Sequence, residues 1–424
     1  MPTPSLLIVP ARFKSGKLYS QIPTSGAGDF TVTRATAATR VNASGFIESV
    51  ASGIPRLDYF ASGGTVGCPA LLVEPSGTNG ILNSTDITTN WALGTNLTSA
   101  SIDVIGLSGN NLTVAVSGSN IGVNTGGLRR TNNNFALASG SIYTISFLLK
   151  KTGSHTIGGY YATITGAAAG DIGGGFDVSG SFSSGQVINT AGTTNRIRRV
   201  ERWGTDVYRC SETFTMTASG TLTTFRLGPT TSVTSANNPD LGVELGFAAP
   251  QIELGSIATS FIPTTTGSVT RNADVVAVSG AVSGSIGQTS GTFYLDIAYT
   301  LRGASTGNRW LEISGPSNNI GLAVATADVV RSIVNSSSDI LATPSTASGV
   351  KIAWGYDGSG VVLFVNGTQY TLTNGGAQLI TALDKVLIDM SSTAGIRMAN
   401  ARIRALALYT TRLTNAELAA LTTP

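Results

Sequence analysis

Residues 141–150 read Ser-Ile-Tyr-Thr-Ile-Ser-Phe-Leu-Leu-Lys, and this stretch decides the fold class. Side chains alternate between the two faces of a β-strand, whereas the apolar residues of a helix recur every three or four positions. In an extended chain one of the two alternating sets is wholly apolar, and it consists of Tyr143, Ile145, Phe147 and Leu149. The stretch therefore predicts a strand with one face in a core.

Runs of the same kind recur on both sides of this strand, separated by Gly, Ser and Asn clusters that are typical of turns. Glycine fills 52 of 424 positions, and charged residues make up 12%, about half the usual share. This composition excludes a coiled coil and a helical bundle. The chain is predicted to be all-β, with antiparallel β-sandwich (jelly-roll) domains. The further runs lie at residues 207–216, 221–227, 243–252, 292–300, 310–313, 350–356, 361–365 and 403–409.

Three regions separate along the chain. Residues 1–88 contain seven of the 14 prolines, which limit pairing in central strands. We therefore expect an irregular, partly extended region that docks on another body. Residues 89–277 and 278–424 repeat the pattern of short strands and turns, and each is predicted to form one antiparallel sandwich. In the last region Asn366-Gly367 is a strong hairpin signal.

One short helix is predicted at the C-terminal end. Thr414 has the position of an N-cap, and Glu417 lies three residues on, which is the spacing of a capping box. Leu413 and Leu418 have the positions of a hydrophobic staple. We expect this helix to plug one end of the second sandwich.

The charge balance argues against a nucleic-acid partner, because a net charge of +3 over 424 residues cannot supply dense phosphate contacts. No apolar stretch approaches the length of about 20 residues that spans a bilayer. In the N-terminal stretch the basic residues follow a short apolar run, whereas in a signal peptide they precede a longer one. We therefore expect synthesis in a cytoplasm and no membrane insertion. The one basic cluster is expected at a solvated strand edge or a subunit contact, and it comprises Arg196, Arg198, Arg199 and Arg202.

The two cysteines, Cys68 and Cys210, belong to no metal-ligand pattern. Two buried thiols are expected, and a disulfide between domains stays open.

Several segments resemble those of bacteriophage structural proteins. Residues 249–264, Ala-Pro-Gln-Ile-Glu-Leu-Gly-Ser-Ile-Ala-Thr-Ser-Phe-Ile-Pro-Thr, resemble the closing strand of a carbohydrate-binding-module-like jelly roll, and residues 207–215 fit its penultimate strands. Residues 403–420 resemble the end of a laminin-G-like, concanavalin-type sandwich. Residues 38–48, 53–59 and 68–75 resemble an N-terminal module of head and tail fibres.

This resemblance implies a bacteriophage virion protein, a head or tail fibre or spike. Residues 1–88 would attach to other virion proteins, and the two sandwiches would project and bind host cell-surface polysaccharide. Such fibres are usually homotrimers, and the location would be the virion, after synthesis in the host bacterial cytoplasm. Two alternatives stay open: a capsid decoration or tail structural protein without glycan binding, and a polysaccharide depolymerase.

Candidate catalytic groups are few. His155 is the one histidine, so a nucleophile–histidine–acid arrangement would have to use it, but its turn-like surroundings predict a surface loop. Glycoside hydrolysis needs two carboxyl groups about 5–9.5 Å apart. Three glycines between Asp171 and Asp177 predict a loop, and the odd spacing of Asp384 and Asp389 would put them on opposite faces of a strand. We therefore predict no catalytic residues and a protein that is not an enzyme.

The glycine runs at residues 158–159 and 173–175 lack the following helix and lysine of a phosphate-binding loop, and they are interpreted as turns. No cofactor and no metal site is predicted. Calcium often accompanies both sandwich families of the resemblance. A structural calcium ion stays unassigned, with oxygen ligands available on Asp296, Asp357 and Asp384.

Sugar binding usually needs an aromatic face together with polar groups for the hydroxyls. Tyr160 and Tyr161 are adjacent in a predicted strand, so one of them should face outward, and Trp310 opens a strand at a loop. These three residues are the predicted ligand-binding residues. Trp354 shares its strand face with apolar residues and is predicted to lie in a core.

Overall fold

The computed structural model is nearly all β, with 57% strand and 4% helix, and its sheets are antiparallel. The predicted fold class is therefore confirmed. Among the residues described, α2 (Asn415–Thr422) is the one α-helix, at the C-terminal end. The structure describes residues 2–61, 64–87, 91–93, 97–102, 111–116, 128–131, 133–179, 187–190, 192–230, 244–300, 308–316, 318–324, 330–334, 337–340, 349–370, 382–388 and 401–424.

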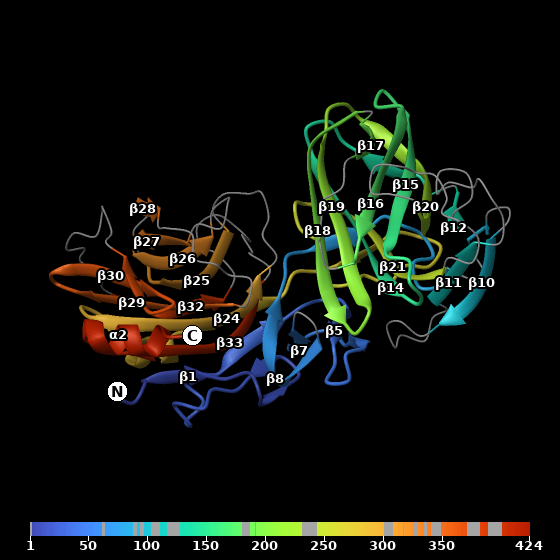
Figure 1. The fold of residues 1–424 in the computed structure, drawn as a ribbon. Coiled ribbons are helices and arrows are strands. Elements are labelled where there is room, and N and C mark those ends of the chain that lie inside the picture. Colours follow the sequence, from blue (N-terminus) through green and yellow to red (C-terminus); the bar gives the residue numbers. More distant parts are fainter. Residues whose placement is uncertain are drawn as a thin grey trace.

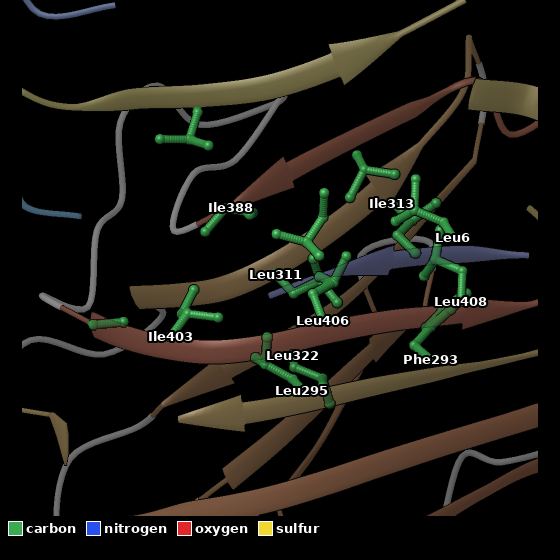
Figure 2. Packing of buried hydrophobic residues seen from close by; sticks show 14 of the residues in the cluster. Leu6, Phe293, Leu295, Leu311, Ile313, Leu322, Ile388, Ile403, Leu406 and Leu408 are labelled. Atoms are coloured by element: carbon green, nitrogen blue, oxygen red, sulfur yellow. The ribbon is translucent and has the colours of Figure 1, made fainter. Parts of the chain in front are cut away.

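Two large sheets form one sandwich around a shared apolar core (Figures 1 and 2). The first has the order β31-β30-β29-β24-β33-β8-β7, with β1 also paired to β33. Its strands are β1 (Leu6–Ile8), β7 (Arg56–Ala61), β8 (Gly64–Val73), β24 (Gly291–Thr300), β29 (Val350–Asp357), β30 (Gly360–Val365), β31 (Thr368–Tyr370) and β33 (Ala401–Tyr409).

The second sheet of this sandwich has the order β2-β3-β4-β23-β32-β25-β26-β27-β28. Trp354 is fully buried between the sheets, as its position in the sequence predicts. The strands are β2 (Phe13–Lys14), β3 (Lys17–Leu18), β4 (Phe30–Thr33), β23 (Val275–Ser279), β25 (Asn308–Ser314), β26 (Asn319–Val324), β27 (Val330–Val334), β28 (Ser337–Ile340) and β32 (Lys385–Ile388).

The N-terminal region is extended, and it docks by strand pairing on the C-terminal sandwich. Leu6 lies opposite Leu408 in the β1–β33 pair, and both side chains point into the core drawn in Figure 2. Val32 lies opposite Val276 in the β4–β23 pair of the other sheet. The region therefore completes both layers of this sandwich. The boundary at residue 88 stays a prediction.

The middle of the chain forms a jelly roll of two six-stranded sheets, ordered β10-β11-β21-β14-β19-β18 and β12-β20-β15-β16-β17, with β13 paired to β20. The predicted apolar face of β14 lies in its core. The strands are β10 (Leu97–Ile102), β11 (Asn111–Val116), β12 (Leu128–Arg130), β13 (Phe135–Leu137), β14 (Ile142–Lys151), β15 (Ile157–Gly166), β16 (Gly170–Asp177), β17 (Val187–Thr190), β18 (Thr193–Gly204), β19 (Val207–Met216), β20 (Gly220–Pro229) and β21 (Glu244–Leu254).

Five short elements complete the described part of the fold. One strand pair lies within the N-terminal region, a second pair joins that region to the segment after the jelly roll, and a 3-10 helix follows β23. These elements are β5 (Ala38–Val41) with β6 (Ile47–Val50), β9 (Gly77–Asn79) with β22 (Val269–Arg271), and η1 (Ala281–Ser285).

The helix α2 has the predicted capping box, with Thr414 and Glu417 bonded reciprocally. Its predicted place is wrong. It does not plug an end of the sandwich but lies on the outer face of β29 and β30, where Leu418 packs against Phe364 and Ala353. The reason is that β29 and β30 are apolar on both faces, so the outer face also needs a cover.

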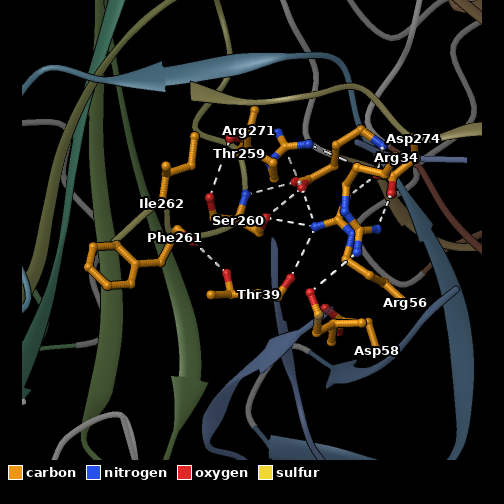
Figure 3. A network of polar contacts seen from close by, with 12 residues as sticks. Arg34, Thr39, Arg56, Asp58, Thr259, Ser260, Phe261, Ile262, Arg271 and Asp274 are labelled. Carbon is orange, nitrogen blue, oxygen red and sulfur yellow. Dashed lines mark hydrogen bonds and ion pairs between the residues drawn. The ribbon is translucent and has the colours of Figure 1, made fainter. Parts of the chain in front are cut away.

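A buried ionic cluster joins the N-terminal region to the segment that leaves the jelly roll (Figure 3). We call it the junction network, and its charged side chains are at most 3% exposed. Arg56 pairs with Glu74 at 2.7 Å and also with Asp274, which Arg34 contacts at 2.8 Å. The Ser260 hydroxyl donates to Glu74. The full set is Arg34, Arg56, Glu74, Ser260, Arg271 and Asp274.

An aromatic contact joins the same N-terminal region to both sandwiches. The ring of Phe60 on β7 lies 5.3 Å from that of Trp203 on β18, and the guanidinium of Arg402 on β33 lies 4.7 Å from the Phe60 ring centre. The guanidinium of Arg209 on β19 lies over the Trp203 ring, 5.6 Å from its centre. The N-terminal region therefore lies between the jelly roll and the C-terminal sandwich.

We expect Asp274→Asn to lower the free energy of unfolding by about 3–5 kcal/mol, because it leaves two buried guanidinium groups without their shared carboxylate. Urea unfolding followed by tryptophan fluorescence measures this. The matched control is Glu48→Gln, which breaks the partly exposed Arg40–Glu48 pair and should cost less than about 1 kcal/mol. Equal losses in the two variants would contradict the structural role of the network.

The pKa of Glu74 predicts an acid-sensitive contribution to stability. Burial by itself would raise this pKa, but the charges of Arg56 and Arg271 and the hydrogen bond from Ser260 hold it well below its usual range. In the unfolded chain a glutamate titrates near about 4.3. Glu74 therefore stabilises the fold above that pH, and the contribution is lost as the pH falls through this value towards the folded pKa.

The stability difference between wild type and Glu74→Gln should thus be largest at neutral pH and shrink below about pH 4.3. Urea titrations at a series of pH values measure it. A difference that is constant with pH would show that Glu74 is not ionised in the folded protein.

Candidate functional site

A polar hollow of about 370 Å³ opens on the outer face of the C-terminal sandwich. In β24 the side chains of Leu295 and Ile297 enter the core, so Asp296 between them faces outward. The same face carries α2. The hollow is lined by Asp296, Gly349, Val350, Lys351, Asn366, Arg404 and Pro424.

The floor of the hollow is an ion pair on neighbouring strands. Nε and Nη2 of Arg404 both donate to Oδ1 of Asp296, at 2.9 and 2.7 Å. The Asp296 side chain is 14% exposed and that of Arg404 is 41% exposed. Oδ2 of Asp296 and Nη1 of Arg404 are not used in this pair, so one acceptor and one donor remain for another group in the hollow.

A β-bulge aims Arg404 at the hollow. Asp296 lies opposite Ala405 and Ile297 lies opposite Ile403, so Arg404 is an extra residue with no partner across the strand pair. Bulges bend the strand and re-aim a side chain in this way.

The tight turn after β30 supplies the opposite wall. Asn366 has a φ of 48° and Gly367 a φ of 80°, the left-handed backbone that Asn-Gly turns adopt. Oδ1 of Asn366 accepts a hydrogen bond from the backbone N of Lys351 at 2.9 Å, which fixes the amide and leaves its Nδ2 hydrogens as donors. Nζ of Lys351 donates to the carbonyl of Thr423 at 2.8 Å.

The hollow therefore holds one carboxylate acceptor among several donors, all on strands or a tight turn. This arrangement suits a ligand with adjacent hydroxyl groups, each of which donates to the carboxylate and accepts from an amide or guanidinium. None of the described residues that line the hollow is aromatic. Sequence reasoning found the Asn366-Gly367 turn and named Asp296 as an oxygen ligand, but it missed Lys351 and Arg404.

The two predicted tyrosines lie on opposite faces of β15. Tyr160 is fully buried in the jelly-roll core and donates to Glu212 at 3.0 Å. Glu212 also pairs with Arg196 and, at 2.9 Å, with Arg198. These two arginine side chains are 6% and 4% exposed, so the expectation of a solvated edge or subunit contact is wrong for them.

The glycine run of β16 makes room for this buried charge. Residues 173–175 lie inside a strand, and so do residues 158–159, so their interpretation as turns is wrong. A Cβ on Gly174 would lie 2.5 Å from Oε2 of Glu212. The missing side chains therefore serve packing between the sheets.

Tyr161 faces the outside of its sheet but is only 9% exposed. The guanidinium of Arg226 lies 5.4 Å from its ring centre. Burial, together with the hydrogen bond that its hydroxyl donates to Asp171, raises the pKa of Tyr161 to about 12. Trp310 belongs to β25 of the other sandwich, and its side chain lies outside the described residues. The structure does not bring the three residues together, and their ligand-binding role stays a prediction.

The candidate carboxylate pairs do not have glycosidase spacing where the structure describes them. Asp171 and Asp177 lie six residues apart in one strand, β16, and not in the expected loop, so their separation is about 20 Å. Asp389 lies outside the described residues. His155 is half-buried, and its Nε2 lies 2.8 Å from the carbonyl oxygen of Ile157.

Metal and cysteine predictions have mixed outcomes. Within the described part of the chain, no group of three or more His, Cys, Asp or Glu side chains could hold a metal ion. Asp357 pairs with Arg412 at 3.4 Å. Both cysteines are free thiols, Cys210 buried as expected and Cys68 exposed, against expectation. No helix among the described residues is long and apolar enough to cross a membrane.

Comparisons with known proteins give only distant matches. No family model and no curated protein matches the chain. The Ruminococcus gnavus IT-sialidase CBM40, solved with alpha2,3 sialyllactose, matches at 16% identity over 32% of this chain and 84% of its own, with a TM-score of 0.27. Mouse laminin alpha1 domains LG4-5 match at 12% identity over 74% and 93%, with a TM-score of 0.22.

The sialidase of Trypanosoma rangeli, solved with sialic acid, matches at 8% identity over 96% of this chain and 60% of its own, with a TM-score of 0.26. At these values the matches carry no argument about ligand or activity. Sialidases, which are enzymes, are among the matches, so the prediction that this protein is not an enzyme is withdrawn.

We expect Tyr160→Phe to lower the free energy of unfolding by about 1.5–3 kcal/mol, because it removes a buried hydrogen bond to a carboxylate. Urea unfolding measures the loss. Saccharide binding by the folded variant should equal that of wild type, since the ring has no contact with solvent. A binding defect without a loss of stability would instead make Tyr160 a ligand-binding residue.

Proposed function

We propose that this protein binds a surface glycan through the hollow at Asp296, and that it does so as a fibre or spike of a bacteriophage virion. The observation that carries the glycan proposal is the fixed array of Asp296, Arg404 and Asn366. Their polar atoms are held by the ion pair and the turn before any ligand arrives. Such preorganisation lowers the entropy cost of binding.

The hollow is open and none of its described lining residues is aromatic, so each site should bind weakly. A millimolar site corresponds to about −4 kcal/mol. Many copies on one particle convert weak sites into strong attachment, because later binding events become intramolecular. A virion projection supplies such copies, and homotrimeric assembly, part of the proposal, would triple the sites on each projection.

The virion role is supported by the sequence segments that resemble phage fibre modules. Because residues 6–8, 56–61 and 64–73 are built into the C-terminal sandwich, we propose that attachment to virion partners uses the folded surface of the N-terminal region and not a free arm. Large apolar side chains are exposed on that surface and are available for such a contact: Val9, Phe13 and Phe46.

A glycan array of bacterial surface polysaccharides, probed with the full chain, tests the proposal. Asp296→Ala should lose the wild-type signal, with affinity reduced at least about tenfold, since a carboxylate acceptor for sugar hydroxyls is removed. Asp357→Ala is the matched control, because Asp357 also pairs with an arginine but lies outside the hollow. Thermal melting confirms that both variants fold.

Three outcomes would contradict the proposal. An unchanged signal in Asp296→Ala would move the site elsewhere. A silent array, with loss of particle stability on deletion of the gene, would favour a decoration or tail structural protein. Release of new reducing ends from a bound polysaccharide would favour a depolymerase.

A further inference from the structure

Two arginines face each other across neighbouring strands of the jelly roll. Arg129 on β12 lies directly opposite Arg226 on β20. The backbone N and O of Arg129 both bond to Ala92, at 2.8 Å each. Its pairing with Arg226 is therefore of the non-hydrogen-bonded kind, in which the two side chains come closest.

Like charges directly opposite each other destabilise a sheet. Arg129 is exposed and Arg226 is partly buried. By comparison, Arg34, Arg56, Arg196 and Arg198 all form ion pairs with a carboxylate. In the part of the chain that the structure describes, Arg129 and Arg226 have no such partner, and Nε of Arg226 is buried without a hydrogen bond. The two arginines thus form no ion pair with a carboxylate among the described residues.

The nearest acid is committed elsewhere. Asp171 accepts the hydrogen bond of the Tyr161 hydroxyl, and the Tyr161 ring lies under the Arg226 guanidinium. Burial lowers the pKa of Arg226 and the charge of Arg129 lowers it further, while the charges of Tyr161 and Asp171 act in the opposite direction without outweighing them. Tyr161 and Asp171 are positioning residues, since they fix the plane of one guanidinium.

We propose that Arg129 and Arg226 bind the carboxylate of an acidic sugar, a hexuronate unit of a polysaccharide. Two guanidinium groups side by side present parallel N–H donors that match the two oxygens of a carboxylate. The saccharide nature of the ligand rests on the proposed function, but the site is separate: β12 and β20 lie in the jelly roll, and the hollow at Asp296 lies in the other sandwich (Figure 1). One chain would then carry a neutral and an acidic sugar site.

Calorimetry with the full chain tests this with a glucuronate-containing disaccharide, its neutral glucose counterpart and inorganic sulfate as probes. Wild type should bind the glucuronate disaccharide, more weakly as salt rises from about 50 to about 300 mM. Arg129→Gln should weaken that binding at least about tenfold, since one of two charge-assisted contacts is lost. Asp357→Ala, which breaks an ion pair outside both proposed sites, should bind the glucuronate disaccharide as wild type does.

A second readout distinguishes a binding role from a structural one. Without ligand, Arg129→Gln should melt at a higher temperature than wild type, because it removes the repulsion. Glucuronate should raise the melting temperature of wild type and not of the variant. A lower melting temperature of the variant, or equal binding by the variant, overturns the site. Binding of sulfate as tight as that of the glucuronate disaccharide, or tight binding of the glucose disaccharide, overturns the assignment to a carboxylated sugar.

Discussion

Arg56 is withdrawn completely from water, and the arrangement of the whole chain follows from what neutralises it. Its partners, Glu74 and Asp274, lie 18 and 218 residues away in the sequence. A buried guanidinium without a carboxylate is very costly, so these partners must meet before the core around them can close. The first strands, the exit of the jelly roll and the C-terminal sandwich are thereby brought to one place. Apolar packing gives the two sandwiches their bulk, and this ionic contact sets how they join.

The requirement that a buried arginine has a carboxylate partner also distinguishes structural clusters from candidate ligand sites elsewhere in the molecule. Inside the jelly roll Glu212 neutralises two arginines, and the missing side chain of Gly174 leaves room for them. At the hollow the Asp296 carboxylate accepts both hydrogen bonds from Arg404 on Oδ1, and its Oδ2 is not used in this pair. At Arg129 and Arg226 two cations face each other on neighbouring strands and form no ion pair among the described residues. A ligand carboxylate bound between these two arginines would supply the negative charge that the described side chains do not.

Local patterns were sufficient for much of the architecture. Alternation places β14 and its core face, and β19 has the predicted bounds of residues 207–216. The capping box places α2 for the same reason, since its signal lies within four residues. The glycine run at residues 173–175 misled because glycine marks turns by its backbone, whereas here its small size is what matters.

The site lay beyond such patterns. The bulge at Arg404 changes which side chains of β33 face outward, and nothing in the spacing of Ile403 and Leu406 says whether the strand is interrupted. The inward turn of Arg196 and Arg198 likewise depends on Glu212, a residue of another strand. Sequence reasoning found many of the strands, though it took residues 158–159 and 173–175 for turns, and it could not assign partners across the strands.

The pairing of β1 with β33 has a consequence for how the protein is made. The hydrogen bond from Ser5 to Leu408 joins residues 403 positions apart. A ribosome that adds about 5–20 residues each second needs roughly 20–80 seconds to travel that distance. Throughout this interval the first strand is outside the tunnel without its partner strand, so its apolar side is uncovered and its edge is open. Until the last strand emerges, aggregation of nascent chains would be avoided only if a chaperone holds the first strand or if two such chains rarely collide.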